Sequence, residues 1–230
     1  DEARFLNLTA SDLGLDSRSL NINYGKQGSY ELFLNYDELP HFVSNSGTSP
    51  FTGIGGSSLT LSPAWVASGN TSGMTALAGP QNKVDLETMR KQLSTGVKFT
   101  TDSPWTYRVK FRHDTKEGTR LSGGSFFFNS TQLVEPVDFV TDEVNASIAY
   151  AAKKWQASMA YYASTFSNEN KSLSWQNPYT ALVTGADTGE LALPPDNEFQ
   201  QITLTAGYDL SDRSRISGDI AIGKSEQNEA

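Results

Sequence analysis

Hydrophobic and polar residues alternate along this chain over many separate stretches. In residues 105–113, which read WTYRVKFRH, the odd positions from Trp105 to Phe111 are all apolar, and the even positions are one threonine and three basic residues. A β-strand points successive side chains to opposite faces. The stretch therefore predicts a strand with one apolar face and one basic face.

The same two-residue period returns in eight further stretches, so we expect nine strands. These stretches are 3–10, 17–25, 29–37, 96–102, 142–151, 154–164, 200–210 and 215–224. Most have about 9–11 residues, which is enough to cross a bilayer at a tilt of about 45°, whereas strands of soluble proteins have about 5–6. We therefore expect an all-β chain that supplies antiparallel strands to a transmembrane β-barrel.

The predicted connections alternate between short and long within a single region, 1–230. Short turns are expected at 25–28, 102–104, 151–154 and 211–214, and long loops at about 37–95, 113–139 and 165–198. Outer-membrane barrels have short periplasmic turns and longer extracellular loops. Residues 80–93 have a weak helical period, and two interpretations stay open there, a short helix or an extended arm. Single-chain bacterial barrels have an even number of strands, so the count is wrong by one or further strands lie outside these residues.

The two faces of the predicted strands differ in chemistry. Aromatic rings on the apolar face lie mostly near strand ends, and such rings prefer the membrane–water boundary. The predicted membrane-interface aromatics are Tyr24, Tyr36, Trp105, Tyr150, Trp155, Tyr161 and Tyr208. The opposite face is polar and would line the lumen of a barrel. Its candidates for contact with a partner are Glu31, Lys98, Arg108, Lys110, Arg112, Glu143, Arg215 and Asp219.

Composition narrows the function further. The formal net charge is −8 and no basic run occurs, so nucleic acid is not an expected partner. The chain has no cysteine, which excludes disulfides, thiol catalysis and haem attachment through C-x-x-C-H. Its two histidines, His41 and His113, stand far apart in the sequence, so we predict no metal site. No catalytic grouping is evident, and we expect no enzymatic activity. Because the chain opens without Met, we interpret it as a mature protein or an internal piece of a longer one.

Four segments, 36–66, 84–99, 135–179 and 193–230, resemble the MtrB/PioB-type family of outer-membrane barrels that partner decahaem cytochromes. The resemblance implies a barrel of more than twenty strands in the outer membrane of a Gram-negative bacterium. It also implies a sheath function. A periplasmic multihaem c-type cytochrome would insert into the lumen, an outer-surface multihaem cytochrome would dock on the loops, and electrons would cross the outer membrane. In this scheme haem c belongs to the partners, and the barrel binds no cofactor of its own.

The basic row of Arg108, Lys110 and Arg112 has two interpretations. These side chains would contact the anionic groups of an inserted cytochrome, or they would pair with carboxylates elsewhere on the lumenal face. Two other functions also stay open at this point. One is a general outer-membrane porin that passes small solutes, and the other is a soluble β-sandwich that binds carbohydrate through its long loops.

Overall fold

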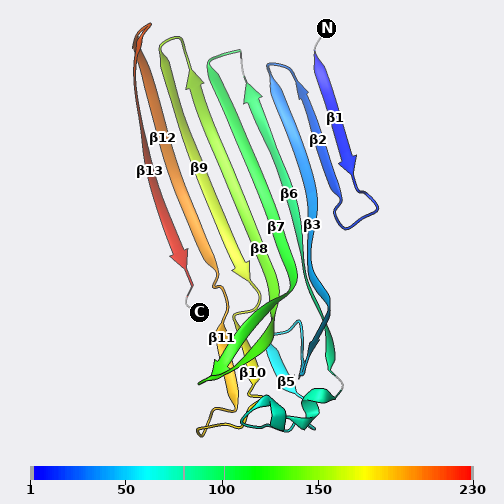
Figure 1. Ribbon diagram of the computed structural model, residues 1–230. Coiled ribbons are helices and arrows are strands. Elements are labelled where there is room, and N and C mark those ends of the chain that lie inside the picture. The colour runs from blue at the N-terminus through cyan, green and yellow to red at the C-terminus, as the bar shows by residue number, and fades with distance from the viewer. Residues whose placement is uncertain (1–2, 80, 101, 229–230) are drawn as a thin grey trace.

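Nine long β-strands form one antiparallel sheet in the structure, a computed structural model that describes residues 3–79, 81–100 and 102–228. Each strand lies beside the next along the chain, so the sheet is a meander (Figure 1). The strands are β1 (Arg4–Ser11), β2 (Ser19–Lys26), β3 (Tyr30–Ser49), β6 (Asn82–Thr100), β7 (Trp105–Phe126), β8 (Asn129–Ala151), β9 (Trp155–Asn168), β12 (Asn197–Ser211) and β13 (Ser214–Gln227). The predicted all-β class and its nine antiparallel strands are confirmed.

Short turns join the strands at one end of the sheet, drawn at the top of Figure 1. They connect β2 to β3, β6 to β7, β8 to β9 and β12 to β13. In the first of them, Gly28 has a φ of +76°, a left-handed conformation that glycine adopts without steric cost. We call this the short-turn end, and the opposite end the long-connection end.

The strand register keeps apolar side chains on one face across all nine strands. One row near the middle of the sheet shows this from edge to edge. It consists of Leu6, Tyr24, Leu32, Val97, Val109, Ala146, Tyr161, Ile202 and Ile222. Several of its large side chains are well exposed, for example Val109 at 46% and Ile202 at 42%. The apolar face is therefore uncovered, which contradicts a β-sandwich, where a second sheet would cover it.

The apolar band runs obliquely to the rows of paired residues. On β3 and β6 the row that contains Tyr36 and Leu93 is still apolar. On β7 and β8 the same row continues with His113 and Asp142, which are polar. At the short-turn end the border of the band shifts in the same direction, because the band extends further on β9 and β12, to Trp155 and Tyr208. Barrel strands tilt against the barrel axis, and an apolar band parallel to the membrane must then cross successive rows in this way.

The prediction of a long loop at 113–139 is wrong. Both β7 and β8 continue through it as regularly paired strands of 22 and 23 residues, joined by a turn at Phe127 and Phe128. The two-residue pattern is lost there because the strands have passed the apolar band. The buried apolar residues that remain on β8, Leu133, Val134 and Val137, do not alternate regularly. The loop predicted at 37–95 is also too long, because β3 and β6 stay paired as far as Ser49 and Asn82.

Residues 82–93 are extended and belong to β6, so the helical interpretation of 80–93 is wrong for the described part of that stretch. The segment pairs with β3 from Asn82 to Leu93, with register shifts at Phe42/Ser44 and Ser44/Gly47. A weak helical period of apolar residues does not compete with such a ladder, because most helical stability comes from tertiary packing rather than local preference.

The rest of the long connections folds into a compact unit that we call the cap. It contains a second sheet in the order β11 (Thr188–Ala192), β10 (Ser172–Gln176), β5 (Ser58–Leu61) and β4 (Phe51–Thr52). Two short 3-10 helices, Thr71–Gly73 and Thr75–Ala78, complete it. The cap lies at the long-connection end (Figure 1). Its core consists of Phe51, Leu59, Leu133, Leu173, Trp175 and Leu193.

Candidate functional site on the polar face of the sheet

Three of the predicted lumenal residues lie in one row on the polar face. Glu31 on β3 is opposite Lys98 on β6, and Lys98 is opposite Arg108 on β7. Lys110 follows two residues further along β7, on the same face. Because side chains alternate along a strand, Val109 lies on the apolar face and these charged side chains lie on the polar face. The sheet thus gathers three cations and one carboxylate over three neighbouring strands.

Further toward the long-connection end, three arginines of this face are paired. Arg112 donates a hydrogen bond to Glu143, its direct cross-strand neighbour. Two more pairs follow, one between β6 and β7 and one between β7 and β8. Arg90 binds Asp114 through Nε and Nη2, with Nη2 to Oδ2 at 2.5 Å, and Arg120 Nη2 lies 2.5 Å from Glu135 Oε1. For Arg112 the structure therefore supports pairing within the lumenal wall.

Lys98, Arg108 and Lys110 are different, and we call them the open basic group. None of them makes an ion pair with another residue of the described ranges, even though Glu31 lies opposite Lys98. Arg108 and Lys110 are also exposed. Like charges directly opposite each other destabilise an antiparallel strand pair. The pairing of Lys98 with Arg108 therefore leaves a local excess of positive charge, which an anion beside this face would neutralise.

An aromatic ring borders the open basic group. Phe33 is apolar but falls on the polar face of β3. It lies over Gly96, where an added Cβ would come within 2.6 Å of the Phe33 ring. Gly96 in turn is the cross-strand neighbour of Lys110. The glycine thus makes room for a ring beside the cations, and neither residue was singled out from the sequence.

Arg215 and Asp219 lie apart from this group, on the edge strand β13. The guanidinium of Arg215 crosses Gly207 and donates a hydrogen bond from Nη2 to Gln156 Oε1 at 2.5 Å. It also lies 3.8 Å from an Asp209 carboxylate oxygen. Within the described part of the chain, Asp219 makes no ion pair. These two predicted residues are therefore not brought together with Arg108.

The predicted interface aromatics fall at two levels of the apolar face. At the short-turn end, neighbouring rings contact one another. The pairs are Tyr24 with Tyr30, Tyr30 with Phe99, Trp105 with Tyr150, and Trp155 with Tyr208, with centroids 6.0, 6.2, 4.9 and 4.8 Å apart. Tyr36 and Tyr161 lie closer to the other border, where their hydroxyls donate to Glu38 and Gln200. Tyr30 and Phe99 join the first level, although the sequence analysis did not select them.

The cap packs against the polar-face side of the β7–β8 arm, the part of these strands that lies beyond the apolar band. The indole ring of Trp175, in the cap, lies between two glycines. A Cβ added at Gly124 would come within 2.2 Å of this ring, and a Cβ added at Gly189 within 2.4 Å. Gly124 is an even-numbered residue of β7, like Arg108, so it lies on the polar face. Phe126 contacts the same indole at a centroid distance of 6.0 Å. The cap therefore leans toward the lumenal side.

Neither histidine lies in a cluster of metal-binding groups. His113 Nδ1 is 2.7 Å from Asp142 Oδ1, and His41 is on a different strand, β3. Over residues 3–79, 81–100 and 102–228 the structure contains no group of three or more His, Asp or Glu side chains that could hold a metal ion. In the same ranges no helix is long and apolar enough to span a membrane.

The family of outer membrane beta-barrel porins MtrB/PioB matches the chain over residues 1–230. The outer membrane protein MtrB of Shewanella baltica (strain OS185) is 32% identical over 221 residues, which cover 96% of this chain and 32% of that protein. The chain thus spans about a third of this relative's length. Among solved structures, outer-membrane expressed OmpT of Vibrio cholerae aligns with 98% of this chain and 52% of its own, at a TM-score of 0.44 and 8% identity.

Proposed function

The chain belongs to the MtrB/PioB family of outer-membrane β-barrel porins, and on this premise we propose that it forms part of a barrel wall enclosing a multihaem c-type cytochrome. Electrons would then cross the outer membrane from haem to haem inside the lumen. The chain's contribution would be an insulating wall with a polar inner face. We propose further that the partner enters from the periplasmic side, which is the short-turn end.

The open basic group is the observation that carries this proposal. Three cations, Lys98, Arg108 and Lys110, lie together on the lumenal face without a carboxylate partner among the described residues, whereas the neighbouring arginines are paired. Haem propionates and acidic side chains of a c-type cytochrome are anionic, so they complement this group. Complementary charge of this kind fixes the register of two partners and accelerates their association.

The redox centres in this proposal belong to the cytochromes. The chain has no cysteine to attach haem c covalently. Its own residues would orient the partner through charge and would exclude lipid and bulk solvent from the electron path. The proposal therefore assigns to the chain no step in which a bond is made or broken.

We propose the outer end of the arm as the contact for an outer-surface cytochrome. Phe127 and Phe128, at the tip of the β7–β8 hairpin, are 64% and 81% exposed. Phe127 also has a φ of +54°, which a large side chain rarely adopts. Exposed aromatic anchors commonly dominate the energy of protein–protein interfaces, and strain of this type collects at functional positions.

A porin is the second candidate, and the family description itself favours it. In that case the same polar face would line a water-filled channel, and water and salt would neutralise the open basic group. The two functions differ in what occupies the lumen. The two functions can therefore be distinguished by testing whether the purified protein contains a haem-bearing partner.

Charge reversal tests the role of the open basic group. In the intact outer-membrane protein, Arg108→Glu with Lys110→Glu should lower the amount of c-type haem that purifies with each barrel several-fold. A matched control exchanges a paired couple, Arg112→Glu with Glu143→Arg, and should retain the haem of the unmodified protein. An unchanged haem content in the first variant would remove these residues from the interface.

A further inference from the structure

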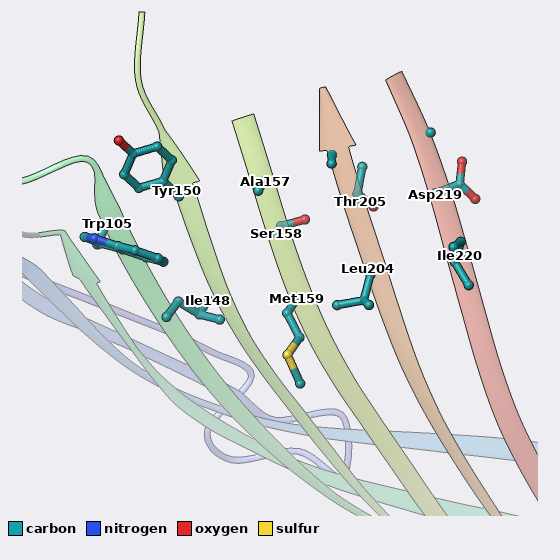
Figure 2. A pocket seen from close by; sticks show the side chains of 12 residues that line it. Trp105, Ile148, Tyr150, Ala157, Ser158, Met159, Leu204, Thr205, Asp219 and Ile220 are labelled. Atoms are coloured by element: carbon teal, nitrogen blue, oxygen red, sulfur yellow. The ribbon is translucent and has the colours of Figure 1, made fainter. Parts of the chain in front are cut away.

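A groove on the apolar face crosses β7, β8, β9, β12 and β13 close to the short-turn end (Figure 2). Its volume is about 580 Å³, within the range of roughly 300–1,000 Å³ that is common for ligand sites. Trp105 and Tyr150 stand at one end of it (Figure 2). The side nearer the middle of the sheet is formed by Ile148, Met159, Leu204 and Ile220.

The groove results from a change of side-chain size along one row of the sheet. In register, this row runs Tyr150, Ala157, Ala206, Gly218. After the tyrosine ring the surface therefore drops across three strands. One row nearer the turns it rises again, because Trp155 and Tyr208 lie there in contact. Aliphatic and aromatic side chains thus bound the groove on three sides.

The surroundings of the groove specify the type of molecule that fills it. It opens on the face whose large apolar residues are exposed, and in an outer-membrane barrel that face contacts lipid. Water in the groove would meet mostly hydrocarbon, and apolar surface is unfavourable to hydrate. An acyl chain would bury this surface and keep its own flexible end in the bilayer.

Cations lie above the groove, in the turns at the short-turn end. Lys153 and Lys154 belong to the β8–β9 turn and Arg213 to the β12–β13 turn, and none of them makes an ion pair with a residue that the structure describes. The end of β12 is joined to the β8–β9 turn by a hydrogen bond from Asp209 N to Lys154 O at 2.9 Å. Asp212 is the acidic residue nearest to Arg213 in sequence. At about 3.3 Å per residue, Lys154 is roughly 10 Å from the groove residue Ala157 along β9.

We propose that this groove binds one acyl chain of an anionic phospholipid of the periplasmic leaflet, whose headgroup phosphate reaches Lys153 and Lys154. Both parts of the phospholipid are matched by the protein, since the acyl chain would contact the apolar groove and the phosphate would contact the two lysines. Basic residues near a membrane surface attract anionic lipids. This site is on the opposite side of the wall from the open basic group, so it does not depend on what the lumen holds.

Native mass spectrometry of the intact barrel protein tests the proposal. The protein would be released from nanodiscs that contain equal amounts of phosphatidylglycerol and phosphatidylethanolamine. We expect one phosphatidylglycerol to stay bound under conditions that strip other lipids. Ala206→Leu with Gly218→Leu fills the groove and should abolish this retention. The larger side chain can be accommodated at Gly218, because an added Cβ there meets no atom within 4 Å. Lys153→Ser with Lys154→Ser should weaken the retention by roughly fivefold per lysine.

The matched control is Ala146→Leu, a substitution on the same apolar face but outside the groove. It should retain phosphatidylglycerol like the unmodified protein. All variants would first be checked for folding by the heat-modifiable migration of barrels on gels. Equal retention of both lipids, or retention that survives the groove-filling variant, would overturn the proposal. So would a protein chain, rather than a lipid, found bound at this face.

Discussion

The barrel wall and the cap belong to one chain but follow opposite rules of burial. Among the described residues, every buried large hydrophobic side chain lies at the long-connection end, in the cap or in the strand arms beside it. Phe51 and Leu173 are completely buried there. In the wall, by contrast, Leu204 is 48% exposed and Ile220 is 64% exposed. The difference shows that the chain meets two solvents, because apolar residues avoid water in the cap but contact lipid in the wall.

The same contrast appears in the use of glycine. In the cap, Gly124 and Gly189 leave room for the Trp175 ring, so that a compact core is filled. In the wall, Gly218 has open space where its side chain would be and leaves the surface hollow. The apolar face of the wall is therefore hollow at Gly218, although on the polar face Gly96 leaves room for the Phe33 ring as the cap glycines do for Trp175.

Replacing a tryptophan in each region should give the largest difference. Trp175→Ala removes a ring from the cap core, and burial of this kind contributes about 3–5 kcal/mol. We expect the cap to unfold locally while the wall stays intact. Trp155→Ala, at a wall residue that is 57% exposed, should have a much smaller effect. Limited proteolysis of the folded protein checks this, with cleavage expected between β9 and β12 only in the first variant.

A charge on the apolar face should give the next largest effect. Ile202→Arg places a cation toward lipid near the middle of the band and should destabilise the barrel by about 2–4 kcal/mol. Thr203→Arg is the control, because the next residue of the same strand points to the polar face. Unfolding of both variants in urea, followed by tryptophan fluorescence, gives the comparison. Equal losses of stability would contradict the assignment of the two faces.

Overpacking the cap should cost somewhat less. Gly124→Val would force a side chain into the Trp175 ring, and crowding of this kind costs about 1–3 kcal/mol. Gly123→Val is a matched control, since an added Cβ at Gly123 meets only the Thr131 carbonyl oxygen, at 3.7 Å. Amide hydrogen exchange in β10 should accelerate in the first variant alone. No acceleration would show that the indole does not depend on this glycine.

The smallest expected effect is a response of the cap to pH. The Lys171 ammonium and the backbone N–H of Asn168 both bind Asp196 and hold its pKa below the ordinary value of 3.8. A carboxyl group whose pKa is lowered by folding stabilises the fold above its ordinary pKa, and this contribution is lost as the pH falls through the lowered value. The protection of the Asn168 amide, measured against its intrinsic exchange rate at each pH, should therefore fall below about pH 4. In Asp196→Asn this fall should disappear.

The strands of the wall could be predicted from the sequence because each of them shows the alternation of apolar and polar residues by itself. Lipid on one side and polar surroundings on the other impose a two-residue period, as in the stretch that contains Val109. The parts of β7 and β8 beyond the apolar band could not be predicted this way, since no lipid imposes the period there and a buried residue such as Leu133 packs into the cap core. The sequence shows no apolar alternation where neither face is in contact with lipid.

The cap could not be predicted because its core joins distant parts of the chain. Leu59 of β5 is in register with Trp175 of β10, and these strands come from two different connections. The open basic group was predicted only in part. All of its residues were candidates from the sequence, but only the strand register distinguishes Arg112, which binds Glu143, from Arg108.

The visible spectrum of the intact protein, purified from outer membranes in mild detergent, tests the central claim most directly. This chain has no cysteine to attach haem c. A c-type haem absorbance that stays with the protein through size exclusion, and that haem staining of a denaturing gel assigns to a second polypeptide, would come from a bound partner. We predict such a band, reducible by dithionite, at a constant ratio of haem to barrel. A colourless barrel that conducts ions in a planar bilayer would contradict the sheath function and establish a porin.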